Sequence, residues 1–355
     1  MSVERVLTHL REQIMHCAAL GSPFTAQLCE CFAEDLLAGG PVADLVGGWP
    51  TSPRADVVGL RLAGALHAAV LMQKDSALAG VYPRAADAWD MTKVWPLARA
   101  FLLRERAWVA DFIRSPPQTN ETRRAIGLLA AFLAFAETWR GPFDMLELGA
   151  SAGLNLNWDR FRYETASWSW GPQSPVTITT EWSGPPPPLA PLHVRRRAGC
   201  DLNPLDIRDP EQRLRLRSYI WPDQPDRLER FDGAVALALQ ADTRVARADA
   251  AEWLKAKLAA RSLDGATIVY HSVFLQYPPQ ETRLAIADAL TSEGANARPE
   301  APLVWVRSEP EALIDGVRGS IRKVIDYIAW PGGVRRVLGH ADGHLRAFEA
   351  SASDA

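Results

Sequence analysis

The amino-acid sequence predicts an α/β protein with a helical N-terminal domain and a C-terminal domain built around a β-sheet. Residues 1–140 carry apolar side chains at helical spacing, as Val3, Leu7 and Leu10 show, and no stretch there has the pattern of a strand. From Phe143 the pattern changes to short apolar runs separated by helical stretches, which is typical of alternating strands and helices. We therefore expect a helical domain over residues 1–140 and a sheet domain over residues 141–350.

Bulk composition narrows the range of partners. A chain of 355 residues is long enough for two domains, and its net charge of -3 argues against nucleic acid as the main partner. The N-terminus has no apolar run long enough for a signal peptide or a membrane span, so we expect a cytoplasmic protein without membrane contact. The four cysteines include no CxxC pair, and we expect no metal site. The oligomeric state is open.

Helix start signals divide the first domain. Ser22-Pro23 places a capping side chain before a proline at the first helical position, and Ser52-Pro53 repeats this start signal ahead of a helix expected over residues 57–72. Asn120 is the expected cap of a further helix that ends near Trp139. These signals predict several helices that together form a bundle or cap beside the second domain.

The second domain contains five apolar runs of strand length and a terminal hairpin. Asp342-Gly343 is the expected hairpin turn. Residues 163–193 interrupt the alternation with several tryptophans and four consecutive prolines, and we interpret them as an inserted flap with a stiff connector. The expected strands are 145–149, 194–201, 231–239 (equally compatible with a helix), 266–274 and 302–309, and the expected helices are 210–219, 248–260 and 279–291.

The stretch from Phe143 to Asn157, FDMLELGASAGLNLN, is the clearest candidate site. A short buried strand ends in the carboxylate of Glu147, passes through small residues, and continues from Leu154 with helical spacing. Such a turn exposes backbone N–H groups beside the carboxyl end of a strand, where open α/β sheets bind nucleotides and related ligands. Asp201 ends the next run and could accept from a ribose, while Asp249 could accept from an adenine or cap a helix.

ELGASAGLN resembles the first motif of class I S-adenosylmethionine-dependent methyltransferases. The resemblance covers roughly residues 143–350 and implies a Rossmann-like, seven-stranded methyltransferase-type sheet that transfers a methyl group from S-adenosylmethionine to a small molecule. It departs from the family where a serine replaces the middle glycine, and where the motif Asn/Asp-Pro-Pro-Tyr is absent. The residues that it places around the cofactor are Glu147, Gly149, Ser151, Gly153, Asn155, Asp201 and Asp249.

The whole chain also resembles an uncharacterised bacterial family of unknown function. The stretches that carry this second resemblance are LELGASAGLNLNWDRF, RAGCDLNPLD, YIWPDQPDR and YHSVFLQY. It implies no established activity.

His271 and Tyr277 follow the run ATIVYHSVF and would line the substrate side of a methyltransferase-type sheet. Either could assist proton removal, since the ordinary pKa of histidine lies near neutrality. A histidine whose hydrogen bonds are all satisfied at the end of a strand is the alternative for His271. Catalysis would otherwise consist of positioning the acceptor against the methyl group.

Two other classes of function use the same residues. Gly149 to Gly153 is a literal GxSxG, the nucleophile motif of α/β-hydrolases, with Ser151 as nucleophile and Asp315 and either His340 or His344 as its partners. The helical character of the first 140 residues argues against it, because several strands precede the motif in that fold. A protein that keeps the fold as a non-catalytic ligand-binding sensor is the other alternative.

Overall fold

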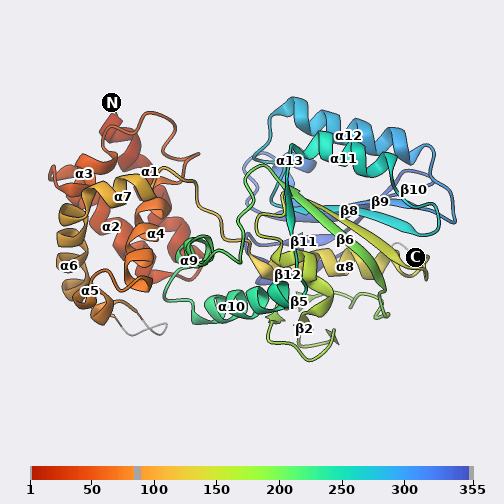
Figure 1. Ribbon diagram of the computed structural model, residues 1–355, viewed down its shortest axis with the longest axis horizontal. Coiled ribbons are helices and arrows are strands. Elements are labelled where there is room, and N and C mark those ends of the chain that lie inside the picture. The colour runs from red at the N-terminus through yellow and green to blue at the C-terminus, as the bar shows by residue number, and fades with distance from the viewer. Residues whose placement is uncertain (1, 84–88, 352–355) are drawn as a thin grey trace. The chain divides into compact units, whose positions relative to one another are not determined.

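A computed structural model describes residues 2–83 and 89–351, which form two units (Figure 1). The first unit runs to Thr119 and also includes Arg208–Glu229, and the second contains Asn120–Ile207 and the chain from Arg230 onward. This division differs from the expected boundary at residue 140. Helix α8 (Ala125–Phe135) belongs to the second unit because Phe132 and Phe135 pack on the sheet, with Phe132 5.5 Å from the ring of Tyr270.

The first unit is helical, as the sequence predicts. Ser22 is the N-cap of its second helix and accepts a hydrogen bond from the Thr25 N–H, and the helix expected over residues 57–72 spans Val58–Leu71, five residues after Pro53. A turn that ends at Val57, in the left-handed conformation, fills the gap. The helices are α1 (Ser2–Ala19), α2 (Pro23–Leu37), α3 (Pro41–Val46), α4 (Val58–Leu71), α5 (Ser76–Val81), α6 (Met91–Arg104), α7 (Arg106–Phe112) and α9 (Pro210–Ser218).

The second unit is built on a mixed sheet. Its nine described strands lie in the order β5-β12-β11-β10-β9-β8-β1-β6-β7, so the expected number of seven is wrong. The strands are β1 (Phe143–Leu148), β5 (Glu181–Ser183), β6 (Val194–Asp201), β7 (Val245–Arg247), β8 (Ala266–Ser272), β9 (Leu303–Pro310), β10 (Lys323–Trp330), β11 (Val334–Ala341) and β12 (Ala347–Ala350).

Strands β7, β6, β1, β8 and β9 are parallel, and β10, β11 and β12 continue the sheet as an antiparallel meander. Numbered along the chain, the five parallel strands have the order 3-2-1-4-5, which is that of the first five strands of a Rossmann sheet. The predicted hairpin is confirmed by the pairing of β11 with β12. The class α/β is therefore correct. The antiparallel strands β10, β11 and β12 lie side by side in the order in which they occur along the chain.

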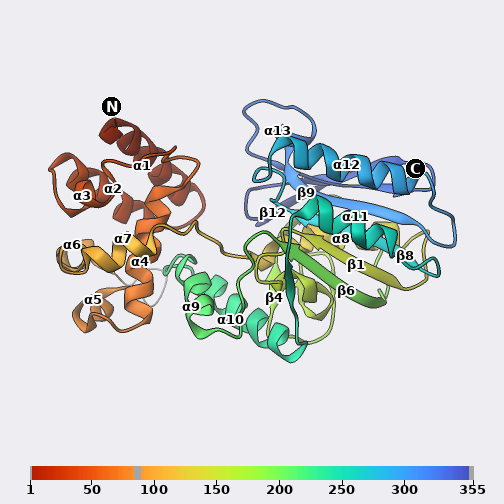
Figure 2. The same cartoon turned by 45° about the horizontal axis from the view of Figure 1, so that its top comes forward.

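Helices cover both faces of the sheet. Helices α11 (Ala250–Ala259) and α12 (Gln280–Gly294) lie over one face, where Leu254 and Leu290 pack with Leu148 (Figure 2). Helix α8 covers the other face. The run 231–239 is helical, within α10 (Pro225–Gln240), and short helices η1 (Thr122–Arg124), η2 (Leu154–Arg160) and α13 (Glu311–Ile314) complete the described part of the unit.

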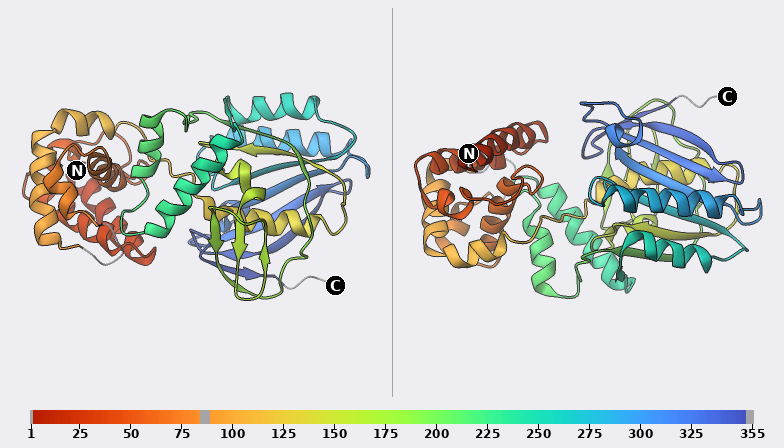
Figure 3. Two further views of the ribbon diagram at one scale, coloured as in Figure 1. Left: turned by 60° about the horizontal axis from the view of Figure 1, so that its bottom comes forward. Right: turned by 90° about the horizontal axis from the view of Figure 1, so that it is seen from above.

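The inserted segment is more integrated than a flap. Strands β2 (Arg162–Glu164), β3 (Ser169–Trp170) and β4 (Thr177–Thr179) form a separate small sheet, visible in the left view of Figure 3. The next strand, β5, joins the main sheet alongside β12, and Trp182 stacks on Phe348 with ring centroids 4.2 Å apart. The connector is held at both ends, because Trp182 donates to the Pro185 carbonyl and Trp170 to the Ala190 carbonyl.

Within residues 2–83 and 89–351, no helix combines the length and the apolar character needed to cross a membrane. The same residues contain no group of three or more metal-ligating side chains that could hold an ion.

Candidate functional site

The carboxyl edge of the parallel strands contains most of the residues that the sequence singles out. From β1 the chain continues to β6 on one side of it, and from β8 to β9 on the other, so the topology switches between β1 and β8. Open α/β sheets bind ligands outside such a switch point. The turn after β1 is therefore the centre of the candidate site.

Three residues of this turn have a left-handed backbone: Gly149 (φ 67°), Ser151 (φ 54°) and Gly153 (φ 77°). At Gly149 a side chain is also excluded by space, because a Cβ would lie 2.4 Å from the ring of Phe274. Ser151 adopts the conformation that a glycine would take freely. The serine in the middle of the motif therefore does not prevent the turn from forming.

Asp201 lies at the end of β6 and contacts this turn. One carboxylate oxygen accepts the Ser151 N–H at 2.9 Å, and the other accepts the Asn203 N–H at 2.8 Å. The parallel pairing of β1 with β6 brings the two segments together although they are separated by the inserted segment in sequence. The structure thus joins the predicted turn and the predicted ribose acceptor in one place.

The backbone donors of the turn are mostly engaged within the protein. The Ala150 N–H donates to Cys200, the Gly153 N–H to Ala150, and the Leu154 N–H to the side chain of Asn120. The expected helix after the turn is the seven-residue 3₁₀ helix η2, with a kink at Asn157. The sequence therefore predicted the position of the turn correctly but overestimated the N–H groups left for an anionic ligand.

Glu147 is a buried carboxyl group beneath the turn. Its Oε2 accepts the Tyr270 hydroxyl at 3.3 Å, and no other described residue donates to the group. Burial raises the pKa of Glu147 to about 8, an effect that the Tyr270 hydrogen bond opposes and the charge of Asp201 reinforces. At neutral pH this carboxyl is therefore largely protonated and can both donate and accept.

Asn155 and Asp249, the other predicted ligand-binding residues, differ in exposure. Asn155 is buried and donates to the Glu121 carbonyl at 3.3 Å, while its own oxygen has no hydrogen-bond partner in the described structure. Asp249 is exposed and caps α11 by accepting from Ala251 and Glu252, so it fits the capping alternative directly.

His271 has no exposed surface. Its Nδ1 lies 2.7 Å from Oε1 of Glu309, and its Nε2 accepts the indole N–H of Trp305 at 2.9 Å. Because Nε2 is an acceptor, the imidazole carries its proton on Nδ1 and donates it to the carboxylate. Both ring nitrogens are engaged, which is the alternative of a fully hydrogen-bonded histidine. Tyr277 is 74% exposed on the following loop.

Glu309 holds the loop that follows β8, a role that the sequence did not reveal. Its carboxylate accepts the Phe274 N–H at 2.8 Å and the Leu275 N–H at 3.3 Å in addition to His271. Val273 just before them has a φ of 53°, which is strained for a β-branched residue. The loop directs Phe274 against Gly149. The only sequence signal was a carboxylate at the end of the run PLVWVRSE.

The residues considered for a hydrolase are far apart. Strands β8, β9 and β10 lie between β1 and β11, so Ser151 and His340 are separated across the sheet by about 19 Å, at ~4.8 Å per strand. His340 contacts Glu311 at 3.2 Å, and Asp315 pairs with Arg335 at 2.7 Å. His344 lies in the connection after β11, equally many strands from the turn. No Ser-His-Asp triad is assembled from these residues.

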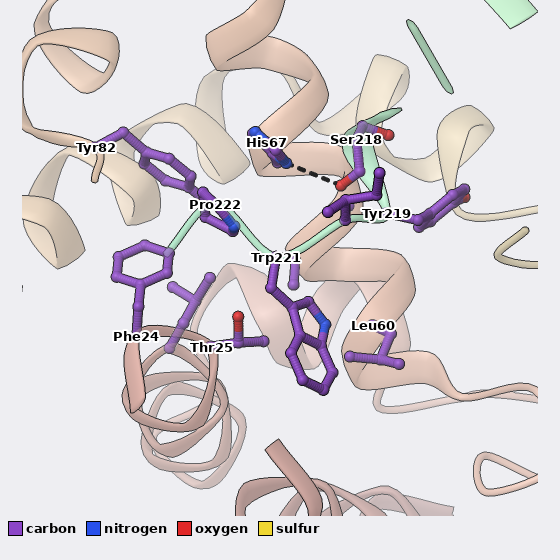
Figure 4. A pocket seen from close by; sticks show the side chains of 13 residues that line it. Phe24, Thr25, Leu60, His67, Tyr82, Ser218, Tyr219, Trp221 and Pro222 are labelled. Carbon is purple, nitrogen blue, oxygen red and sulfur yellow. Dashed lines mark hydrogen bonds between the residues drawn. The ribbon is translucent and has the colours of Figure 1, made fainter. Parts of the chain in front are cut away.

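The helical unit has a small buried cavity of about 10 Å³ (Figure 4). His67 points into it and its Nδ1 contacts the Ser218 carbonyl at 3.1 Å, while burial lowers the pKa of His67 to about 4. The Tyr82 hydroxyl is buried nearby without a hydrogen-bond partner among the described residues. A space of this size suits one water molecule, and not an organic ligand.

A family model described as an uncharacterised protein conserved in bacteria (DUF2332) matches residues 8–349. No curated protein and no solved structure matches the chain.

Proposed function

The chain belongs to the DUF2332 family of uncharacterised bacterial proteins, and for this member we propose S-adenosylmethionine-dependent methyl transfer to a small molecule. The cofactor would lie across the turn after β1 and the end of β6. When bound, it supplies an activated methyl group on sulfur. The protein's own contribution is binding, orientation and exclusion of water.

The observation that carries this proposal is the contact between Asp201 and Ser151. It places a strand-end carboxylate directly on a turn with three left-handed residues, at the topological switch point of the sheet. Each oxygen of Asp201 accepts one backbone N–H and keeps a further lone pair for a ribose hydroxyl. The half-buried carboxylate is thus oriented in advance, which lowers the entropic cost of binding a diol.

Glu147 would complete the cofactor site from below. A buried carboxyl with one hydrogen-bonded oxygen has capacity for one more polar contact, and its raised pKa makes it a donor as well as an acceptor. Asn155 and Asp249 would be secondary, since Asn155 is buried and Asp249 already caps a helix.

Binding of S-adenosylhomocysteine, measured by calorimetry, tests the proposal. The native protein should bind, and Asp201→Asn should weaken binding by about 1.5–3 kcal/mol because a charge-assisted hydrogen bond is lost. Asp288→Asn, at an exposed position on α12, is the matched control and should bind as the native protein does. Absence of binding by the folded native protein at millimolar ligand would reject the cofactor.

A non-catalytic ligand-binding protein is the second candidate, and the state of His271 favours it. The histidine predicted to remove a proton has both nitrogens engaged in a buried network. Methyl transfer to an acceptor that is already nucleophilic needs no base. A measurement of turnover therefore distinguishes a methyltransferase from a non-catalytic ligand-binding protein. A protein that binds S-adenosylhomocysteine but methylates no compound in a broad metabolite screen would be a sensor.

A further inference from the structure

Lys323 is a buried lysine at the same edge of the sheet as the candidate site. It is the first residue of β10 and pairs with Pro310 at the end of β9. Ile325 and Tyr327 on the same strand face α8, and alternation along a strand places Lys323 on that face too. Glu147 is on this face as well, since its partner Tyr270 packs on α8. Only 7% of Lys323 is exposed.

The ammonium group of Lys323 forms no hydrogen bond or ion pair with the described residues. The carboxylates whose charges act on it, raising its pKa, are those of Glu309 and Asp342. Glu309 alternates to the opposite face of the sheet, where it accepts from His271 and the loop after β8. Asp342 accepts from the backbone and side chain of Arg346. Both carboxylates are therefore committed to other donors.

Such a position is energetically costly, because buried charges in proteins are normally paired. Burial, together with the nearby charge of Arg124, lowers the pKa of Lys323 to about 8. The amine nevertheless remains mostly protonated at neutral pH. A largely buried cation without a protein partner favours an anion as its ligand.

We propose that Lys323 is the anchor of a binding subsite for an anionic group of a small molecule, a carboxylate or a phosphate. The subsite lies where β9 ends and β10 begins. It supplies the positive charge that the turn after β1 lacks, since the N–H groups of that turn are mostly engaged within the protein. Two strands separate β10 from β1, which places Lys323 about 14 Å along the edge.

Asp201 ends β6, one strand beyond β1, and is therefore about 19 Å from Lys323 along the edge at ~4.8 Å per strand, a distance that suits the far end of an extended ligand that begins at Asp201. If the proposed methyl transfer is correct, the anion belongs to the methyl acceptor, and this assignment rests on that function. The anion subsite itself does not depend on it.

Thermal unfolding in added anions tests the subsite with three proteins: native, Lys323→Met and Lys257→Met. Lys257 is an exposed lysine on α11 and is the matched control. Inorganic phosphate and succinate are titrated separately, each against sodium chloride at equal ionic strength. We expect one of them to raise the melting temperature of the native protein and of Lys257→Met in a saturable manner, and the effective anion identifies the group.

Lys323→Met should lose this response, with at least a roughly tenfold weaker apparent affinity, because a charge-assisted hydrogen bond is removed. It should also melt no lower than the native protein in chloride, since methionine fills a similar volume without a buried charge. An equal response to phosphate or succinate in all three proteins would indicate general salt stabilisation and overturn the proposal.

The proposal would also be overturned if the native protein did not respond to either anion. A large loss of stability in Lys323→Met without a response in the native protein would show a purely structural lysine. Calorimetry with S-adenosylhomocysteine reports on Asp201 independently, so failure of the subsite and failure of the proposed function can be distinguished.

Discussion

Glu147 and Glu309 are two buried glutamates at the same edge of one sheet, and their surroundings differ sharply. Glu309 accepts three hydrogen bonds, from His271 and two backbone N–H groups. Glu147 accepts one, from the Tyr270 hydroxyl. A buried carboxylate with several donors organises the structure around it, whereas one with a single weak donor is held at an energetic cost. This difference separates a structural carboxylate from a candidate ligand-binding one.

Substituting Glu309 should have the largest effect on stability. Glu309→Gln replaces one acceptor oxygen by an amide that faces N–H donors, so we expect a loss of roughly 3 kcal/mol in the free energy of unfolding. Urea denaturation measures it, with Glu281→Gln at an exposed position of α12 as the control. A loss below about 1 kcal/mol would mean that Glu309 does not hold the loop and does not differ from Glu147 as a structural carboxylate.

Substituting Glu147 should raise the free energy of unfolding at neutral pH, whereas substituting Glu309 lowers it. The pKa of Glu147 is raised from the usual 4.5 to about 8, so the folded protein retains a proton that the unfolded chain has released between these values. Stability from this group is full below about pH 4.5 and falls as pH rises toward 8, by at most about 1.4 kcal/mol per pH unit.

Glu147→Gln should remove this pH dependence and stabilise the protein by roughly 2 kcal/mol at pH 7, because no buried proton has to be retained. Urea denaturation between pH 5 and 8, with the native protein alongside, provides the measurement. An unchanged slope with pH in the variant would show that another group is responsible. A variant less stable than the native protein at pH 8 would place Glu147 in the same class as Glu309.

Asp249 is an exposed carboxylate, in contrast to Glu147 and Glu309, and its substitution should have the smallest effect on stability. Asp249→Ala removes the cap of α11 and should cost about 1 kcal/mol of stability. Affinity for S-adenosylhomocysteine should fall by less than about threefold, well short of the effect at Asp201. Asp288→Ala in the middle of α12 controls for the loss of a surface charge. A larger loss of affinity than of stability would make Asp249 an adenine contact first and a cap second.

Much of the fold could be predicted from local pattern. The runs at β1, β8 and β9 are largely buried on both faces, so their apolar character is visible in the sequence. Among the strands that were not predicted, β7 and β10 were missed for clear physical reasons. Strand β7 has three residues and is largely exposed, and β10 contains the charged side chains of Lys323 and Asp326. Asp326 is tolerated because Arg307 and Arg335 pair with it.

The residues of the candidate site could be predicted where they stand at strand ends. Their contacts could not be predicted where they depend on pairing between strands that are distant in the chain. Glu147, the turn after it and Asp201 are strand ends, and parallel topology brings strand ends together. Whether a side chain at such an end is free or engaged depends on its neighbours across the sheet. His271 illustrates this limit, since Glu309 and Trp305 come from another strand. Lys323 illustrates the opposite case, because the sequence gives no sign that its ammonium group has no hydrogen-bond partner among the described residues.

The short strand β5 has a consequence for self-association. Together with β7 it forms the outermost strands of the sheet, and each has only three residues. Short edge strands offer few unpaired N–H and C=O groups to another chain, which limits edge-to-edge aggregation. Without the inserted segment, the C-terminal strand β12 and its aromatic Phe348 would become the edge. The insertion therefore acts as a protective cover for the last strand of the sheet.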